Sequence, residues 1–279
     1  METFGERLHH ATADRGPLCV GIDPHASLLL EWGLSDDVEG LSRFSQTVVD
    51  ALAERVAVFK PQVAFFERFG SRGVAVLEST IRQLRDAGAL VLLDAKRGDI
   101  GSTMAGYADA YLNPSSPLYV DAITVTPYLG FGSLRPAFDA AARFGGGVFV
   151  VTLTSNPEGP QFQHARTADG RTVAQFILDE ISQLNAGAGP LGSVGAVVGA
   201  TIGDTGHDLT RTGGPFLVPG LGAQGGDPAG LRAIFGSAID AVLPSYSREV
   251  LAGGPSVSGL RDSSGRALDA VVTALRHAV

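Results

Sequence analysis

The sequence has a single cysteine, Cys19, among its 279 residues. One thiol can form neither an intrachain disulfide nor a cysteine zinc cluster, so both of these stabilising devices are excluded. The apolar neighbours Leu18 and Val20 predict that the thiol is buried in a hydrophobic core. A chain of this kind suits a reducing compartment, and we expect it to work in the cytoplasm.

Basic side chains are in the minority, with 21 Lys and Arg against 29 Asp and Glu, a net charge of −8 and a pI near 5.2. This balance argues against a nucleic-acid or anionic-membrane partner, although a local pocket could still hold a small anion. The first ten residues lack the basic start and apolar run of a signal peptide. No uncharged run is long enough to cross a bilayer, so we expect a soluble, unexported protein.

The composition, 44% hydrophobic and 18% charged, is that of a globular protein with a sizeable core. Short β-branched runs alternate with longer segments of helical periodicity, as in parallel βα units. We predict eight strands, at Leu18–Asp23, Val56–Lys60, Leu90–Asp94, Ala122–Thr126, Val148–Leu153, Gly195–Gly199, Phe216–Pro219 and Ala238–Leu243.

The segments between the strands predict amphipathic helices over Leu41–Glu54 and Val74–Ala87, and a last helix over Ala267–Ala278 closes the chain. A doubly wound open sheet would show the same alternation, but it typically has fewer strands, and no Gly-x-Gly-x-x-Gly follows the first strand. Eight units favour closure. We therefore predict an α/β fold, a TIM (β/α)8 barrel that forms a single domain over residues 1–279.

Most polar residues of chemical interest directly follow the predicted strands, where the loops of a TIM barrel form the active site. At the third strand Asp94 and Lys96 project to the same side, and Gly98 lets Asp99 turn away. For a generic sequence, a solvated cluster, with Asp99 capping a helix that begins near Ser102, is the favoured explanation of these charges. Lys60 favours a site, because it ends the preceding strand and brings a further charge to the same face.

Four segments of the chain resemble the orotidine 5'-phosphate decarboxylases, in particular the longer bacterial subfamily. They are Asp-Ala-Lys-Arg-Gly-Asp-Ile-Gly-Ser-Thr at 94–103, Phe-Lys-Pro-Gln at 59–62, Thr-Ser-Asn-Pro at 154–157 and Val-Pro-Gly-Leu-Gly-Ala-Gln-Gly-Gly-Asp at 218–227. The resemblance implies a carboxy-lyase that converts orotidine 5'-phosphate to UMP and carbon dioxide, the last step of de novo pyrimidine nucleotide synthesis. It also implies a charge network of Lys60, Asp94, Lys96 and Asp99, and a homodimer in which Asp99 and Thr103 reach the neighbouring subunit's site.

The chemistry that this resemblance implies depends on electrostatics. Loss of carbon dioxide from C6 of the pyrimidine leaves a carbanion that cannot spread simply into a carbonyl, and the sequence has no recognisable pyridoxal-phosphate or thiamine motif. A cation beside C6 would stabilise the developing charge and donate the proton, and Lys96 is our candidate. Asp94 and Asp99 would keep Lys96 protonated, with Lys60 between the carboxylates. We expect neither a cofactor nor a metal.

The substrate-binding shell also follows the strands. The resemblance implies that Asp23 binds the ribose hydroxyls and that Ser155 binds the pyrimidine edge, although either residue could simply form a turn. After strands seven and eight we expect the phosphate site. Its candidates are Pro219, Gly220 and Gln224 in a Gly-rich loop and Arg248 beyond the last strand, where the extra Pro-Ser-Tyr-Ser departs from the commoner family pattern.

Other functions remain open from the sequence. A metal-dependent sugar-phosphate decarboxylase or aldolase of the same barrel suprafamily resembles the chain at Asp94, Lys96 and Asp99, but typically has an acidic metal ligand where Lys60 stands. A Schiff-base aldolase or a non-catalytic nucleotide-binding barrel are further alternatives. We expect His25 near the mouth of the pocket and His164 and His207 in loops, and we interpret all three as incidental rather than as metal ligands.

Overall fold

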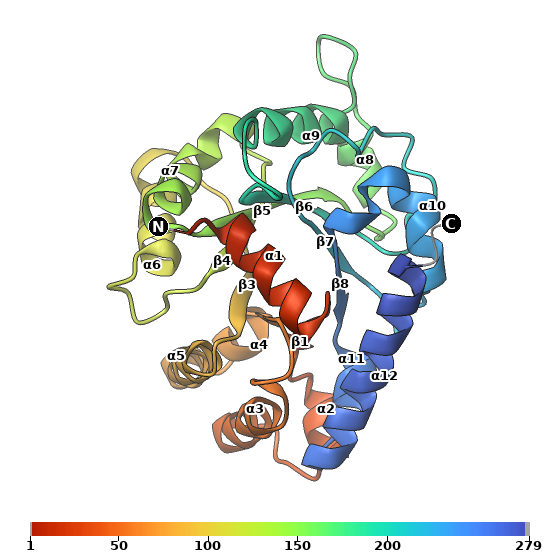
Figure 1. The fold of residues 1–279 in the computed structure, drawn as a ribbon. Helices are drawn as coiled ribbons and strands as arrows, with labels where there is room; N and C mark the ends of the chain where they lie inside the picture. Colours follow the sequence, from red (N-terminus) through yellow and green to blue (C-terminus); the bar gives the residue numbers. More distant parts are fainter. Residues whose placement is uncertain (1, 277–279) are drawn as a thin grey trace.

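Eight parallel strands form a closed barrel in chain order in the computed structural model, which describes residues 2–276. Helices surround the strands, and α1 lies across one end of the barrel (Figure 1). This architecture confirms the predicted TIM barrel. The strands are β1 Cys19–Ile22, β2 Val58–Pro61, β3 Leu90–Arg97, β4 Ala122–Val125, β5 Gly147–Leu153, β6 Val194–Val198, β7 Phe216–Pro219 and β8 Val242–Tyr246.

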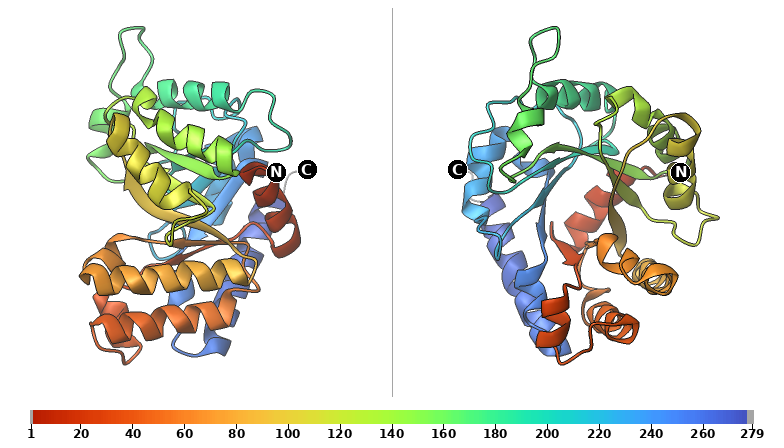
Figure 2. Two further views of the ribbon diagram at one scale, coloured as in Figure 1. Left: turned by 90° about the vertical axis from the view of Figure 1, so that its left-hand side faces the viewer. Right: turned by 180° about the vertical axis from the view of Figure 1, so that it is seen from behind.

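The helices cover the outer surface of the barrel, and α3 and α5 lie side by side along it (Figure 2). Among the described residues, none of the helices combines the length and the apolar character needed to cross a bilayer. The α-helices are α1 Phe4–Arg15, α2 Ala26–Glu31, α3 Val38–Leu52, α4 Ala64–Glu67, α5 Gly70–Asp86, α6 Gly101–Leu112, α7 Arg135–Phe144, α8 Gly159–Gln163, α9 Val173–Leu184, α10 Leu231–Phe235, α11 Arg248–Leu251 and α12 Val257–Arg276. Three short 3-10 segments, Phe131–Leu134, Pro228–Gly230 and Gly236–Ala241, complete the set.

The strands are apolar on both faces because each face is covered. Leu92 points into the barrel interior and packs in a small inner cluster with Cys19 and Phe149, whereas its neighbour Leu93 belongs to the large core between the barrel and the helices. This double burial explains the continuous apolar runs of the sequence. Cys19 is fully buried, as its apolar neighbours predicted.

The predicted eighth strand was placed too early. Residues 238–241 form part of a 3-10 segment, and β8 begins at Val242, where its register with β7 pairs Phe216 with Val242. A short apolar run does not reveal where a strand starts, because barrel closure sets that point through pairing with both neighbours. Ser245 therefore lies inside a strand, and Arg248 comes only two residues after its end.

The other bounds also differ in places. β3 continues three residues beyond the predicted end at Asp94, and α12 begins at Val257, ten residues before the predicted start. The predicted end of that helix at Ala278 lies outside the described residues. The remaining predicted strands, and the helices over 41–54 and 74–87, overlap those observed.

Candidate active site

The end of β3 delivers two charged side chains to the carboxyl end of the barrel. Asp94 and Lys96 lie on the same side of the strand, with the Lys96 Nζ 2.6 Å from the Asp94 Oδ1. From the end of β2, the Lys60 Nζ lies 3.3 Å from the other oxygen of the same carboxylate. Asp94 thus bridges two ammonium groups, as expected from the order of the strands.

Burial disfavours the charged forms of Lys60 and Asp94, and the opposite charges of the cluster compensate for this cost. Lys60 is 5% exposed and Asp94 is 8% exposed. Burial lowers the pKa of Lys60, but the attraction of Asp23 and Asp94 outweighs it, and the pKa ends well above its ordinary value. Burial likewise raises the pKa of Asp94, yet Lys60 and Lys96 overcome this effect and hold the pKa at about 2. Both groups are therefore charged at neutral pH.

A cavity of about 330 Å³ opens above this cluster at the carboxyl ends of the strands. A pocket with an apolar wall and a few convergent polar groups is typical of a small-molecule site. Its apolar wall includes Phe65, Val151, Val197 and Leu217, and its polar and loop residues include Asp23, His25, Lys60, Asp94, Lys96, Thr124, Thr154, Pro219, Gly220, Gln224, Ser245, Ser247 and Arg248.

The structure brings most of the predicted site residues to this cavity, but three stay outside its wall. Asp99 is half-buried and accepts a hydrogen bond from the Ile100 N–H at 2.7 Å, and Thr103 is exposed on α6. Asp99 is not the helix cap, since Ile100 holds that position. Ser155 is exposed beside Thr154, which does line the cavity.

The backbone of the loop after β7 has a defined conformation with internal hydrogen bonds. Gly220, Gly222 and Gly225 adopt positive φ values of 101°, 67° and 89°, which only glycine tolerates readily. The Gly226 N–H donates to the Gly220 carbonyl, and a side chain at position 226 would lie 2.5 Å from that oxygen. The turn therefore presents Gln224 to the cavity in a defined position.

Several residues of the cavity escaped the sequence interpretation. Ser245 and Ser247 lie in the Pro-Ser-Tyr-Ser segment before Arg248, but neither was predicted as a binding residue. The Ser247 Oγ and the Asp23 Oδ1 are buried without a hydrogen-bond partner in the part of the chain that the structure describes. Buried polar atoms are rarely left unpaired, so both atoms are candidates for ligand contacts.

Thr124 was also missed. It lies on β4, and its hydroxyl donates a hydrogen bond of 2.8 Å to the Asp94 Oδ1. A threonine inside an apolar strand gives little sequence signal. A clearer signal was the distribution of lysine, because Lys60 and Lys96 are the two lysines of the entire sequence.

The histidines divide in the structure. His25 lines the cavity, as its predicted position near the pocket mouth requires, and packs edge-on against Phe65, with ring centroids 4.2 Å apart. The rings of His164 and His207 pack against each other, with centroids 5.6 Å apart, and neither residue lines the cavity. Within residues 2–276, no group of three or more His, Cys, Asp or Glu side chains is arranged to hold a metal ion.

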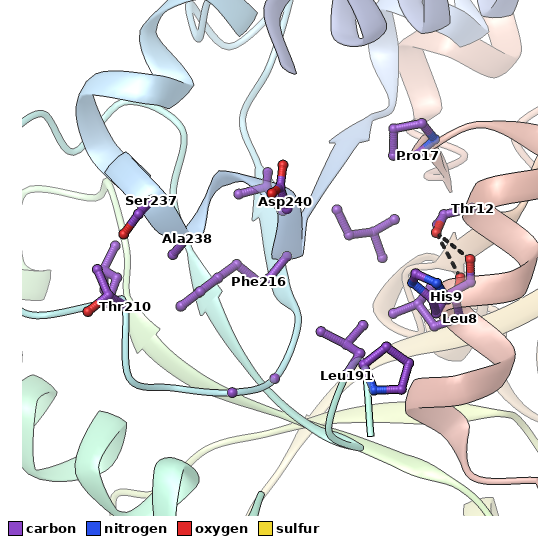
Figure 3. Close-up of a pocket in the computed structure, with 17 residues that line it drawn as sticks. Leu8, His9, Thr12, Pro17, Leu191, Thr210, Phe216, Ser237, Ala238 and Asp240 are labelled. Atoms are coloured by element: carbon purple, nitrogen blue, oxygen red, sulfur yellow. Dashed lines mark hydrogen bonds between the residues drawn. The ribbon is translucent and has the colours of Figure 1, made fainter. Parts of the chain in front are cut away.

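A second cavity, of about 310 Å³, lies at the opposite end of the barrel (Figure 3). It is lined by residues of α1, including Leu8 and His9, and by the first residues of β7 and β8. Its ionisable side chains are His9 and Asp240, which form no charge network like that around Asp94. The cavity at the carboxyl end is therefore the candidate active site.

Comparison with known proteins gives a consistent result. The family model described as "Orotidine 5'-phosphate decarboxylase / HUMPS family" matches residues 16–258. A protein of Salinispora arenicola named orotidine 5'-phosphate decarboxylase is 73% identical over 96% of each chain, and one of Streptomyces coelicolor is 61% identical over 95% of this chain and 96% of its own.

Solved structures agree with these sequence matches. The crystal structure of a Streptomyces avermitilis protein that is 61% identical superposes with a TM-score of 0.96, covering 99% of this chain and 96% of that chain. The structure of Leishmania donovani OMP decarboxylase, at 29% identity, gives a TM-score of 0.77 and covers 99% of this chain and 100% of its own. The similarity therefore extends over the whole barrel.

Proposed function

The chain belongs to the orotidine 5'-phosphate decarboxylase / HUMPS family, and we propose that it converts orotidine 5'-phosphate to UMP and carbon dioxide. This reaction is the last step of de novo pyrimidine nucleotide synthesis and makes the protein a carboxy-lyase. The observation that carries the proposal is the Lys60–Asp94–Lys96 network at the base of the cavity, in which Lys60 and Asp94 are buried and Lys96 is open to the cavity. We also propose that the protein acts in the cytoplasm and binds neither nucleic acid nor a membrane.

Lys96 performs the central step in this proposal. As the bond between C6 and the carboxylate breaks, the ammonium group stabilises the electron pair left on C6 and then transfers its proton there. The side chain is suited to this role because it is 45% exposed towards the open cavity while Asp94 holds its Nζ at 2.6 Å. The chain's own charges supply this stabilisation, so the reaction as proposed uses neither a metal nor a cofactor.

Asp94 and Lys60 set the field around the reacting atoms. The Asp94 carboxylate would face the substrate carboxylate, and this repulsion is relieved when carbon dioxide departs. The phosphate, bound at a distance, supplies the free energy that holds the substrate against this repulsion. Lys60 neutralises Asp94 from the other side and keeps the buried cluster from carrying excess negative charge.

The remaining cavity residues bind the substrate. Asp23 would accept hydrogen bonds from the ribose hydroxyls, and Ser155, next to the cavity-lining Thr154, would bind the pyrimidine edge. Pro219, Gly220 and Gln224 would surround the phosphate, together with Arg248, whose guanidinium suits bidentate contact with phosphate oxygens. The position of this subsite after β7 and β8 is common in TIM barrels.

We propose further that the protein is a homodimer in which Asp99 and Thr103 enter the partner's site. Asp99 does not line the cavity of its own chain, and the adjacent Ile100 is more than half exposed. Tyr128 and Leu129, in the loop after the neighbouring β4, are also more than half exposed. Exposed large apolar residues on the loops after adjacent strands are what a subunit interface would cover.

A spectrophotometric assay on orotidine 5'-phosphate, with and without a chelator, tests the activity. Wild-type protein should turn over equally in both conditions, and Lys96→Ala should lower kcat by at least about a thousandfold while still binding UMP. Arg72→Ala, which removes an exposed cation from α5, serves as the control and should behave as wild type.

Other outcomes would favour the competing functions. Loss of turnover in chelator would indicate a metal-dependent relative, and a substrate adduct trapped by borohydride would indicate a Schiff-base aldolase. Binding of UMP without any turnover by the wild type would indicate a nucleotide-binding barrel. Near-normal turnover by Lys96→Ala would remove Lys96 from the catalytic role.

A further inference from the structure

Lys96 has an unusual backbone for its residue type. Its φ is 45°, in the left-handed region, and it is the one non-glycine residue within 2–276 with a positive φ. A lysine has no side-chain group that stabilises this conformation locally, so surrounding contacts must hold it there. The residue that we assign to proton transfer is therefore also the one non-glycine residue of the described chain whose backbone lies in the left-handed region.

The strain arises where β3 bulges away from β4. Leu93 pairs with Ile123, but the next pair joins Arg97 to Val125. Three residues of β3 thus lie opposite one residue of β4, which is Thr124. In such a bulge the backbone ladder is interrupted, and the N–H groups of the extra residues need other acceptors.

Thr124 supplies the missing contact with its side chain. Its Oγ1 accepts a hydrogen bond of 2.9 Å from the Lys96 backbone N–H and donates one of 2.8 Å to the Asp94 Oδ1. The same carboxylate oxygen accepts from the Lys96 Nζ at 2.6 Å. Thr124 is 1% exposed, so water cannot readily replace these bonds. The Thr124 hydroxyl therefore contacts both groups that orient the Lys96 ammonium: the Lys96 backbone and the Asp94 carboxylate.

We propose that Thr124 is a positioning residue for the decarboxylation, and this inference rests on the proposed function. Its hydroxyl fixes the backbone of Lys96 in the left-handed region and the carboxylate of Asp94 in the matching orientation. Together these contacts place the ammonium group beside the position that C6 of the substrate will occupy. The role requires a small group that accepts and donates at once, which serine can replace and valine cannot.

Three variants test the inference through turnover. Thr124→Val, which keeps the shape and removes the hydroxyl, should lower kcat by roughly 10- to 100-fold, because a displacement of about 1 Å is costly in a pre-organised site. The KM should stay within about threefold, since the phosphate and ribose contacts are untouched. Thr124→Ser should stay near wild type in both parameters.

Thr152→Val is the matched control. Thr152 is also a 1% exposed threonine, on the adjacent β5, but its hydroxyl bonds to the Val150 carbonyl at 2.9 Å and it does not line the cavity. This variant should retain the wild-type kcat. If Thr124→Val yields no folded protein, Thr124→Ala removes the hydroxyl without adding bulk. Equal kcat in wild type and the folded hydroxyl-free variant, or equal loss in Thr124→Ser, overturns the inference.

A second measurement does not depend on turnover. Because the sequence has two lysines, protein labelled with ¹³C,¹⁵N-lysine gives backbone signals from Lys60 and Lys96 alone. In the hydroxyl-free variant the ¹³Cα and ¹³Cβ shifts of Lys96 should move out of the left-handed range, while those of Lys60 stay. Unchanged Lys96 shifts overturn the inference even if the wild type acts on another substrate. If the wild type is inactive but the Lys96 signals move in the hydroxyl-free variant, the result counts against the proposed function instead.

Discussion

Lysine occurs in this chain at two positions, and both contact the same carboxylate of the candidate active site. Lys60 and Lys96 are its two lysines, and all its other strong cations are arginines. Arginine can form the ion pairs of a protein surface, but it does not release its proton in proteins, whereas an ammonium group can. The two positions that retain lysine are those that contact Asp94 in the cavity, and at Lys96 the proposed reaction requires a proton donor.

Asp94 makes the stability of the protein depend on pH. Its folded pKa of about 2 lies below its ordinary value of 3.8, so its ionised form stabilises the folded state above about pH 4. That contribution, about 2 kcal/mol at pH 7, should fall to roughly half at pH 3 and vanish below pH 2. Asp94→Asn should therefore lower the free energy of unfolding by about 2–4 kcal/mol at pH 7 and by clearly less at pH 3, as measured by urea denaturation.

Asp139→Asn is the control for this measurement. Asp139 is an exposed carboxylate whose partner, Arg135, is also exposed, so the variant should lie within about 0.5 kcal/mol of wild type at both pH values. A difference between wild type and Asp94→Asn that is the same at pH 3 and pH 7 would show that the Asp94 pKa is not depressed by folding.

At the level of secondary-structure elements, α1 closes the end of the barrel opposite the cavity. Its first turn is fixed by a capping box, in which the Thr3 hydroxyl accepts from the Glu6 N–H and the Glu6 carboxylate accepts from the Thr3 N–H. Phe4 and Leu8 then pack into the inner cluster of the barrel. This helix covers apolar surface that would otherwise face water at the base of the strands.

Arg7 anchors α1 to the barrel. It donates to the Asp121 carboxylate and, at 3.0 Å, to the Gly145 carbonyl. Arg7→Met should lower the free energy of unfolding by about 2–4 kcal/mol, because Asp121 is buried and would keep only the more distant Arg85 at 3.7 Å as a cation partner. The kcat should not change, because the active site lies at the opposite end of the barrel. Chemical denaturation and the decarboxylation assay on the same preparations check both expectations.

The comparison variant for Arg7 is Arg135→Met. Arg135 pairs with Asp139 one turn along an exposed helix face, and such pairs contribute about 0.5 kcal/mol or less. If Arg7→Met costs no more than Arg135→Met, the anchoring role of Arg7 is wrong.

At the scale of the whole molecule, the two ends of the barrel have different tasks. The amino end, closed by α1 and Arg7, stabilises the fold, and the carboxyl end holds the charged cavity. This division is general for TIM barrels, in which the loops after the strands can vary without disturbing the strand packing. In this chain Asp99 lies on the loop between β3 and α6, and the proposed dimer requires this loop to reach the neighbouring subunit.

Mixing two inactive variants tests the proposed dimer. Lys96→Ala and Asp99→Ala should each be inactive alone, but a mixed dimer would combine the intact Lys96 of one subunit with the intact Asp99 of the other. Coexpressed in equal amounts, they should recover roughly a quarter of the wild-type activity, since half the dimers are mixed and each has one complete site. Absence of recovery, with mixed dimers demonstrated by tagged subunits, would place Asp99 in its own subunit's site or outside the reaction.

The sequence by itself determined the features that depend on neighbours along the chain. Alternating apolar runs and helical periods predicted the barrel, and the spacing of Asp94 and Lys96 placed both side chains on one side of β3. The order of the strands predicted that Lys60 would join them, because consecutive strands of a barrel are adjacent.

Only the tertiary structure decided the features that depend on contacts between distant segments. Pairing with β7 and β1 set the start of β8 and so brought Ser245 and Ser247 into the cavity. The bulge in β3, and the Thr124 hydroxyl that spans it, depend on a register between strands 28 residues apart. No local period encodes that register. Barrel closure fixes it, because every strand must satisfy the hydrogen bonds of both its neighbours at once.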